Sequence, residues 1–366
     1  MPRIGIIGCG KIADQHAESI RRIPGAELVG VCDSELLMSR QLAERFGVPA
    51  AFLDVASFLK DARPDVVHVT TPPQSHHALG RQCLEAGCHV YMEKPFTVHA
   101  GEAEDLLDLA ARKGCKVTAG HNVQFAPEMV DMRAAVKEGF LGGPAVHVES
   151  TFSYDMGDVR YVSALLGDKQ HWVRQLPGKL LHNIISHGLA KIAEFLPGDH
   201  PSVSAVGFAS PTMRAAGETE VYDELRVLIS DPLGTTAYFS FTTQVGPPVQ
   251  ELRVFGPKGS LFVDNLHRTL VRVDSGSSQR KSYLNFFVPP WKLGAQLRRN
   301  ARRNVARFIR SDFHMDAGIG NLISAFYRAV DGHQDVPIPY REILLTSRLM
   351  DEIFSQISSG LAASRG

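Results

Sequence analysis

Short apolar runs alternate with helix-like segments through the first 120 residues. The apolar runs occupy Ile4–Ile7, Leu28–Cys32, Val66–Thr70, His89–Met92 and Cys115–Ala119, with a shorter segment at Ala51–Leu53. Between them, apolar residues recur at helical spacing in Asp14–Arg22, Leu36–Phe46, Val55–Lys60, Ser75–Ala86 and Ala100–Lys113. Strands that alternate with helices predict an α/β domain, in which right-handed crossovers build a parallel sheet.

The pattern changes after residue 122. A helix is predicted for Pro127–Glu138, and the following runs show two-residue alternation or dense β-branched content, which predicts a large, mostly antiparallel open sheet. These runs are Ala145–Phe152, Val203–Phe208, Leu225–Ile229, Thr235–Thr243, Gln250–Phe255, Leu261–Val263 and Leu270–Val273. One helix, Leu180–Phe195, interrupts them, and three more helices close the chain. We expect two domains, residues 1–122 and 123–366, joined without a flexible linker and with the substrate cleft between them.

A tight glycine turn joins the first strand to the first helix. Gly8, Gly10 and Ala13 form the pattern G-x-G-x-x-A, with Lys11 and Ile12 between the second glycine and the alanine. Gly8 allows a sharp turn, Gly10 leaves room for a pyrophosphate, and Ala13 allows close packing of the helix on the strand. The N–H groups at the start of the helix then face the phosphates. We expect these five residues to bind a dinucleotide.

Asp33 follows the second strand and lies 25 residues after Gly8. This separation is close to the ~20 residues expected for the acid that binds the adenosine ribose. A carboxylate there accepts hydrogen bonds from both ribose hydroxyls and repels a 2′-phosphate. We therefore predict NAD rather than NADP, although Arg40 nearby would weaken this preference.

Three loops follow strands at the edge where a dinucleotide must lie, because ligands of such sheets bind at the carboxyl ends of the strands. We expect the cofactor-binding residues of these loops to be Thr71, Pro72, His76, Glu93, Lys94 and Asn122.

Lys94 directly follows an apolar strand and precedes Pro95, which fixes the backbone around it and also permits a cis peptide bond. A lysine in a partly dry pocket loses its proton more easily and can serve acid–base chemistry. The alternative is a solvated surface lysine.

Asn183 and His187 lie four residues apart in the predicted Leu180–Phe195 helix and would share one face, with His182 and Ser186 on a neighbouring face. A histidine there could relay a proton at neutral pH. The alternative is a structural histidine whose hydrogen bonds are satisfied.

The charges balance, with 39 Lys and Arg against 39 Asp and Glu. This balance gives no general attraction to nucleic acid. No apolar run reaches the ~20 residues that a membrane span needs. The N-terminus leads straight into a core strand, so we expect no signal peptide.

Five cysteines are present, an odd number, and no two form a C-x-x-C pair. They are typical of reduced, mostly buried thiols, which favours a cytoplasmic protein. Cys83 and Cys88 with a histidine could bind zinc, but we expect no metal site. The cysteines are Cys9, Cys32, Cys83, Cys88 and Cys115.

A basic helix is predicted late in the chain. Its apolar stripe contains Leu293, Leu297, Ala301, Val305 and Phe308, and its arginines are Arg298, Arg299, Arg302, Arg303, Arg307 and Arg310. The simplest interpretation is an amphipathic helix that packs on the domain and leaves its charged face in solvent. It could also bind phosphate groups of a nucleotide sugar. A third interpretation is weak contact with an anionic membrane surface, with Trp291 at the boundary.

Taken together, the chain resembles the Gfo/Idh/MocA family of NAD(P)-dependent oxidoreductases. The specific features are the loop Thr71-Pro72-x-x-x-His76, the motif Glu93-Lys94-Pro95 and the segment Pro127–Gly142, in this order after the glycine turn. The resemblance implies a Rossmann domain followed by an α/β domain whose open sheet mediates dimer or tetramer contacts. It also implies Lys94 beside the nicotinamide and the substrate hydroxyl, and His187 in the cleft.

The chain departs from the family at Asn183, because the family usually has an aspartate four residues before the histidine. Asparagine binds a hydroxyl but takes no proton, so acid–base work would rest on Lys94 and His187. His182 is also unusual, and Pro73 stands where the family often has asparagine. The implied reaction is hydride transfer between a nicotinamide and a secondary alcohol or ketone of a sugar, a cyclitol or a nucleotide-activated sugar. Two alternatives are an NAD-dependent glycosidase that oxidises its sugar transiently and a non-catalytic sensor or scaffold that binds the cofactor.

Overall fold

A computed structural model describes residues 2–154, 156, 167–218, 220–274, 283–310 and 317–363. The described residues form two compact units. The first unit lies within residues 1–122, 182–186 and 318–351, and the second lies within residues 123–181, 187–317 and 352–366. Two segments from the later part of the chain, residues 182–186 and 318–351, therefore fold with the first unit, which the hydrophobic pattern does not predict.

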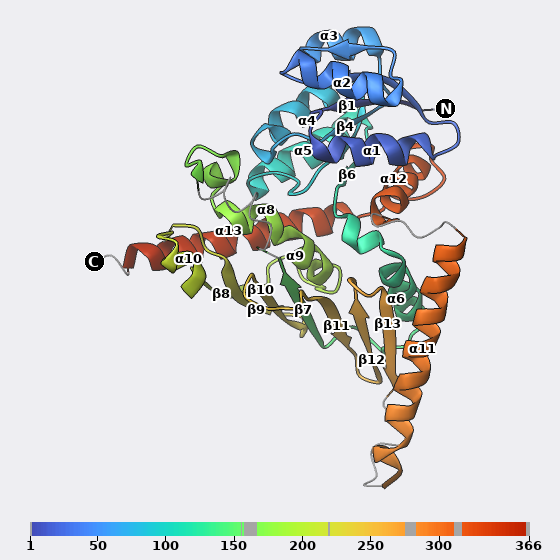
Figure 1. The fold of residues 1–366 in the computed structure, drawn as a ribbon, viewed down its shortest axis with the longest axis vertical. Coiled ribbons are helices and arrows are strands. Elements are labelled where there is room, and N and C mark those ends of the chain that lie inside the picture. Colours follow the sequence, from blue (N-terminus) through green and yellow to red (C-terminus); the bar gives the residue numbers. More distant parts are fainter. Residues whose placement is uncertain are drawn as a thin grey trace. The chain divides into compact units, whose positions relative to one another are not determined.

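The first unit is built on a six-stranded sheet in the order β3-β2-β1-β4-β5-β6, in which every pair of neighbours is parallel (Figure 1). This order is that of a doubly wound Rossmann sheet, with its topological switch between β1 and β4. The strands are β1 (Arg3–Ile7), β2 (Glu27–Cys32), β3 (Ala51–Phe52), β4 (Val66–Val69), β5 (His89–Met92) and β6 (Val117–Ala119). The fold class predicted from the sequence is confirmed.

Five helices connect these strands: α1 (Lys11–Arg21), α2 (Leu36–Phe46), α3 (Val55–Ala62), α4 (His76–Glu85) and α5 (Ala100–Lys113). A 3-10 turn, η1 (Pro73–Ser75), precedes α4. Helix α1 begins three residues earlier than predicted, because the chain turns into the helix directly after Gly10.

The late segment of the first unit covers the edge strand β6. It contains α12 (Ala317–Val330) and the first half of α13 (Tyr340–Ala363). The backbone N–H of Val117 donates to the Tyr340 hydroxyl at 3.0 Å, and the Lys116 ammonium donates to the carbonyl of Ala329. An uncovered edge strand would expose unpaired backbone groups, so this segment protects the sheet.

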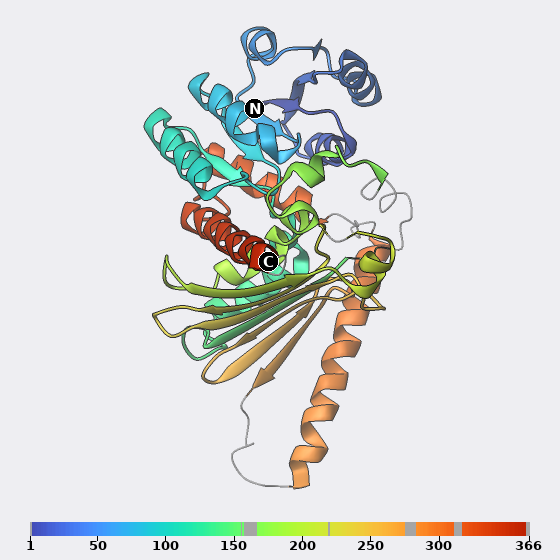
Figure 2. The ribbon, with the colours of Figure 1, turned by 90° about the vertical axis from the view of Figure 1, so that its left-hand side faces the viewer.

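The second unit contains a seven-stranded sheet in the order β13-β12-β11-β7-β10-β9-β8 (Figures 1 and 2). Only β10 and β7 are parallel among these neighbours, so the sheet is mostly antiparallel, as predicted. The strands are β7 (His147–Ser153), β8 (Ser202–Phe208), β9 (Glu224–Ser230), β10 (Thr236–Thr242), β11 (Gln250–Phe255), β12 (Gly259–Asp264) and β13 (Thr269–Asp274).

Helices pack against this sheet and its edge. The remaining elements are α6 (Pro127–Lys137), α8 (Lys179–Ile184), α9 (Ser186–Ala193), α10 (Pro211–Ala215), α11 (Val288–Ile309) and the 3-10 turns η2 (Asn122–Phe125), η3 (Trp172–Gln175) and η5 (Tyr283–Phe286). Among the helices of the described ranges, none is both long enough and apolar enough to cross a bilayer.

The single helix predicted for Leu180–Phe195 is wrong. Helix α8 ends at Ile184 and α9 begins at Ser186. Helix propensity is low here, because the β-branched Ile184 and Ile185 are followed by Ser186 and Gly188. The spacing of apolar residues alone does not reflect this low propensity. Gly188 has a packing role, because a Cβ there would lie 2.2 Å from the ring of Phe239.

Helix α11 also departs from its simplest interpretation. Its polar side chains, not its apolar stripe, pack on the sheet. The Gln296, Asn300 and Asn304 amides hydrogen-bond backbone carbonyls of β13 and the turn before it. Leu297, Val305 and Phe308 of the predicted stripe are exposed.

Candidate functional site

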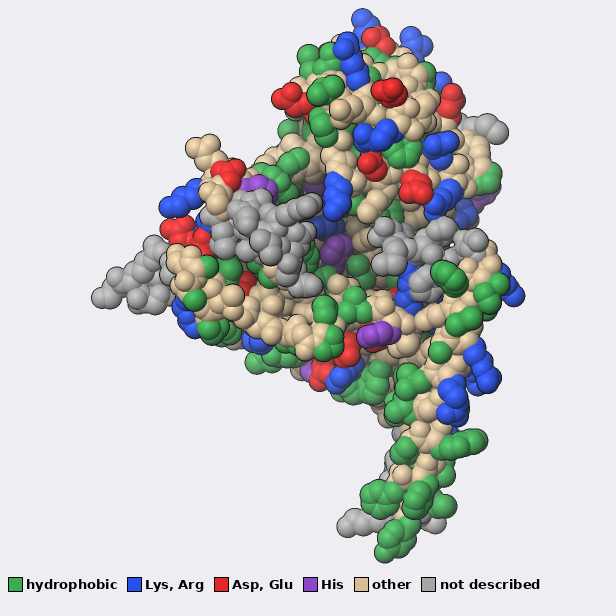
Figure 3. All heavy atoms as spheres, in the orientation of Figure 1, with side chains coloured by type: hydrophobic (Ala, Val, Ile, Leu, Met, Phe, Trp, Pro, Cys, Tyr) green, Lys and Arg blue, Asp and Glu red, His purple; other side chains and the backbone are tan. Residues whose placement is uncertain are grey.

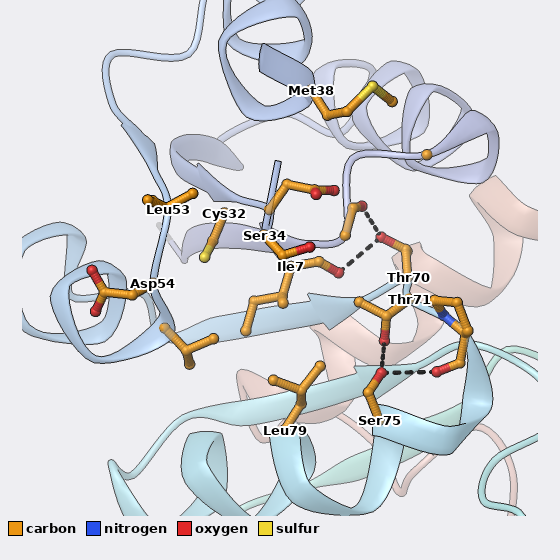
Figure 4. Close-up of a pocket in the computed structure, with 15 residues that line it drawn as sticks. Ile7, Cys32, Ser34, Met38, Leu53, Asp54, Thr70, Thr71, Ser75 and Leu79 are labelled. Atoms are coloured by element: carbon orange, nitrogen blue, oxygen red, sulfur yellow. Dashed lines mark hydrogen bonds between the residues drawn. The ribbon is translucent and has the colours of Figure 1, made fainter. Parts of the chain in front are cut away.

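A pocket of about 540 Å³ lies at the carboxyl ends of β1, β2 and β4 (Figure 4). Five of the residues predicted to bind a cofactor line it: Gly8, Gly10, Asp33, Thr71 and Pro72. In Figure 4, Leu53 and Asp54 lie across the pocket from Thr71 and Ser75. The pocket therefore occupies the switch point of the sheet, where doubly wound folds bind their ligands.

The glycine turn forms the floor of this pocket. Gly8 has a φ of +92°, and a Cβ there would lie 2.6 Å from the Thr71 side chain and 2.9 Å from the backbone of Thr70 and Thr71. Its N–H donates to the Cys32 carbonyl at 2.8 Å, which joins the turn to β2. Gly8 is thus required by backbone conformation and by packing.

Gly10 has a different role, because a Cβ there would meet no atom within 4 Å. No side chain caps the first turn of α1, where Lys11 and Ile12 lie. Ala13 is fully buried, and its N–H donates to the Gly10 carbonyl at 3.0 Å. Open space above Gly10 and an uncapped helix N-terminus fit the pyrophosphate of a dinucleotide.

The two glycines should respond differently to substitution. We expect Gly8→Ala to lower the free energy of unfolding by about 3 kcal/mol, through a left-handed backbone and a steric clash. Gly10→Val should leave it within about 0.5 kcal/mol and weaken NAD binding at least about tenfold, since its side chain fills the space above the turn. Urea unfolding and calorimetric NAD titration measure the two quantities. A Gly10→Val protein that binds NAD normally would contradict this assignment.

The Asp33 carboxylate is fixed at the end of β2. Its Oδ2 accepts from the N–H of Cys9 at 2.6 Å, and its Oδ1 accepts from the N–H of Glu35 at 2.9 Å. A carboxylate has about four lone-pair sites. Those not used by the backbone can accept hydrogen bonds from two ribose hydroxyls.

His76 lies outside the pocket lining and connects two loops. It is fully buried, with Nε2 at 2.9 Å from the Thr71 carbonyl and Nδ1 at 3.0 Å from the Pro95 carbonyl. Burial lowers its pKa below the ordinary value, although the backbone carbonyls oppose this effect. The imidazole therefore holds the Thr71–Pro72 loop, which lines the pocket, in register with the loop that carries Lys94.

Lys94 is half-buried after β5, and its peptide bond to Pro95 is cis. Its Nζ donates to the backbone carbonyl of Asn183 at 2.9 Å and lies 3.5 Å from the Asn183 Oδ1. Burial lowers the pKa of the Lys94 ammonium, and the neighbouring Glu93 carboxylate partly opposes this shift. The structure thus brings together two of the three residues predicted to be catalytic.

A buried polar chain that the sequence did not reveal leads to Glu93. The Tyr327 hydroxyl lies 2.8 Å from His68 Nε2, the His68 and His16 Nδ1 atoms lie 2.8 Å apart, and His16 Nε2 lies 3.0 Å from Glu93 Oε1. All three contacts are hydrogen bonds if the Tyr327 hydroxyl donates to His68, His68 donates to His16, and His16 donates to the Glu93 carboxylate.

This chain of hydrogen bonds holds the Glu93 carboxylate in place beside Lys94. Burial raises the pKa of Glu93, but the hydrogen bond from His16 and the adjacent Lys94 outweigh it and leave the pKa below its ordinary value. The backbone N–H of Lys94 also donates to Glu93 Oε2 at 3.1 Å. The one feature of the sequence that points to these buried hydrogen bonds is His16, a polar residue on the same face of α1 as the buried Ala13, Ala17 and Ile20.

His121 follows β6 and is buried, and neither of its ring nitrogens has a hydrogen-bond partner among the described residues. Burial lowers its pKa from 6.5 to about 4; the nearby Glu93 carboxylate raises this pKa by a smaller amount, and the Lys94 ammonium lowers it further. As the pH is lowered, this histidine therefore binds a proton at a higher pH in the unfolded chain than in the folded chain.

We expect the free energy of unfolding to fall as the pH decreases from 6.5 to about 4, by about 3 kcal/mol from His121 alone. His121→Gln should remove this part of the pH dependence. His333→Gln, at an exposed position, is the matched control and should keep it. Urea unfolding at a series of pH values measures the difference, and parallel curves for the wild type and His121→Gln would contradict the assignment.

The remaining predicted residues lie elsewhere. Asn122 begins η2, and its N–H donates to the Gly120 carbonyl at 2.8 Å. His187 belongs to the second unit, where its ring stacks on Phe152 with centroids 6.1 Å apart.

Residues 2–121 match the model of the Gfo/Idh/MocA oxidoreductase family with an NAD-binding Rossmann fold. The myo-inositol 2-dehydrogenase of Thermotoga maritima is 26% identical over 79% of this chain and 84% of the relative. The D-glucoside 3-dehydrogenase of Escherichia coli is 36% identical over 38% of this chain and 40% of the relative.

Solved structures share the whole fold. The WlbA dehydrogenase of Bordetella pertussis, determined with NADH and UDP-GlcNAcA, superposes with a TM-score of 0.77 at 17% identity, over 98% of this chain and 96% of that chain. At this identity the similarity concerns the fold.

Proposed function

Because the chain belongs to the Gfo/Idh/MocA family of NAD-binding oxidoreductases, we propose that it transfers a hydride between NAD and a secondary alcohol or ketone of a sugar, a cyclitol or a nucleotide-activated sugar. The protein is an NAD-dependent dehydrogenase. The observation that carries the proposed reaction is the Lys94 amine, which is half-buried just after β5. Strand β5 pairs with β4, and the residues that follow β4 line the dinucleotide pocket.

NAD, when bound, supplies the hydride acceptor. We assign its pyrophosphate to Gly8, Gly10, Lys11, Ile12 and Ala13, because this turn leaves open space at an uncapped helix end. The Asp33 carboxylate would bind the adenosine ribose, and the loop at Thr71 and Pro72 would form one wall of the site. His76 would act indirectly, by holding this loop.

A hydroxyl group that loses a hydride from its carbon must also lose its proton, or positive charge would accumulate in the transition state. Lys94 would hydrogen-bond that oxygen. Asn183 would orient the Lys94 amine, since its carbonyl already accepts from Nζ at 2.9 Å. His187 is our proposal for the group that accepts the proton. Such acid–base assistance contributes about 10²–10⁴-fold to a rate.

A panel of myo-inositol, D-glucosides and UDP-sugars tests this proposal, with NADH absorbance as the readout. Steady NADH formation with one class, lost in Lys94→Ala, would support it and name the substrate class. Product release without net NADH would indicate a glycosidase that re-reduces its sugar. Tight NAD binding without turnover of any compound would favour a non-catalytic role.

We further propose that the protein is a cytoplasmic homodimer or homotetramer. All five cysteines are free and buried, which suits a reducing compartment. The second unit's sheet exposes Val206, Phe208 and Leu228 on neighbouring strands β8 and β9, an apolar area suited to a second copy. Light scattering of the purified protein would decide the oligomeric state.

A further inference from the structure

Helix α11 is attached to its unit by polar groups. The side-chain amide of Gln296 makes two hydrogen bonds of 2.9 Å with the backbone of Arg272 in the edge strand β13. Its Oε1 accepts from the Arg272 N–H, and its Nε2 donates to the Arg272 carbonyl. Asn300 and Asn304 follow at four-residue spacing and donate to the carbonyls of Leu270 and His267 at 2.9 and 3.0 Å. These amides thus occupy the helix face that a soluble amphipathic helix usually fills with apolar residues.

The apolar side chains of α11 and η5 point away from the unit instead. Aromatic residues gather at the N-terminal end of the helix, where Phe286 and Trp291 are each 73% exposed. The other end carries Phe308 and Ile309, which are 72% and 75% exposed. Figure 3 shows hydrophobic side chains along this helix and around its lower end. Together with Phe287, Leu297 and Val305, they form what we call the outer face.

The cations of this segment lie beside the outer face. Residues 283–310 contain six arginines and one lysine and no aspartate or glutamate. Arg303 pairs with Asp131 of α6, and Lys292 lies 3.8 Å from Asp274. Within the described part of the chain, no carboxylate pairs with Arg298, Arg299, Arg302 or Arg310. On a helical wheel, Arg298 and Arg302 project opposite Gln296 and Asn300.

We propose that α11 and η5 form an interfacial segment that rests on the anionic surface of a membrane. The aromatic and aliphatic side chains would enter the boundary between headgroups and acyl chains, and the arginines would contact lipid phosphates. A second copy on this face is disfavoured, because two sets of arginines would meet without a carboxylate on the outer face. This proposal does not depend on the reaction assigned above.

Co-sedimentation of the full chain with vesicles tests the proposal. At physiological salt we expect at least about tenfold tighter binding to phosphatidylcholine vesicles containing phosphatidylglycerol than to phosphatidylcholine alone, and weaker binding at high salt. The triple variant Arg298→Glu, Arg299→Glu, Arg302→Glu should lose this binding. Its matched control, Lys60→Glu, Arg112→Glu, Lys113→Glu, makes the same charge change on exposed positions of the first unit and should retain it.

A second readout follows one side chain. The chain has two tryptophans, so Trp172→Phe leaves Trp291 as the sole reporter. Its emission should shift to the blue with anionic vesicles and be quenched by brominated lipid chains. NAD affinity serves as the folding check and should be unchanged in every variant. Absence of vesicle binding, or equal binding by the triple variant and its control, would overturn the proposal. The proposal would also be overturned if the wild type did not bind vesicles and the double variant Phe286→Ser, Trp291→Ser lost a dimer that the wild type forms.

Discussion

Lys94→Ala is expected to lower kcat by about 10²–10⁴-fold while NAD affinity changes less than about threefold. The Lys94 side chain follows β5, outside the residues that line the dinucleotide pocket, so the cofactor keeps its contacts. The lost group is the donor to the reacting oxygen, whose interaction strengthens in the transition state. Steady-state kinetics with the substrate found in the panel and calorimetric NAD titration measure the two effects.

Two variants separate chemistry from folding. Lys94→Met keeps most of the side-chain length without the amine, so it should be as inactive as Lys94→Ala. Lys60→Ala removes an exposed lysine of α3 in the same unit and should leave the rate unchanged. Thermal unfolding of all three proteins checks that the loss of the hydrogen bond to Asn183 has not disrupted the unit. A Lys94→Met enzyme with most of its activity would remove this lysine from the mechanism.

The elements that the sequence predicts best are those fixed by local chemistry. Helices α2 and α5 have the predicted bounds, because Gly47 and Gly114 end them in the left-handed conformation, each with a φ of 65°. The glycine turn and the Asp33 position are equally local. A strand followed by G-x-G-x-x-A leaves few alternatives for the backbone, and the acid follows at the end of the next strand.

Contacts between distant parts of the chain do not follow from local sequence patterns. The chain from Tyr327 through His68 to Glu93 joins residues more than 200 positions apart, and no spacing rule predicts it. The break between α8 and α9 depends on propensity and on packing against Phe239. For α11, the sequence predicts the apolar stripe, but a hydrophobic pattern does not say which face of the helix packs against the protein. The amides that pair with β13 decide this.

The carboxylate of Asp33 should decide between the two forms of the cofactor. Both of its oxygens are fixed by backbone N–H groups of Cys9 and Glu35, so its negative charge is held at the pocket. A bound NAD would place ribose hydroxyls against it, whereas NADP would bring a phosphate with two negative charges to the same position. The preference for NAD therefore rests on hydrogen bonding and on repulsion at one group.

Asp33→Asn should reduce the ratio of NAD to NADP affinity by about 10- to 100-fold, since charged hydrogen bonds contribute about 1.5–3 kcal/mol. The ratio is the right readout, because an amide facing two N–H donors also loosens the glycine turn and weakens both cofactors together. Asp54→Asn is the matched control. It removes the same charge from the same pocket, at the residue that caps α3 through the Ser57 N–H, and should leave the ratio unchanged. Calorimetric titrations of both cofactors provide the ratio, and an unaltered value in Asp33→Asn would show that another group selects the cofactor.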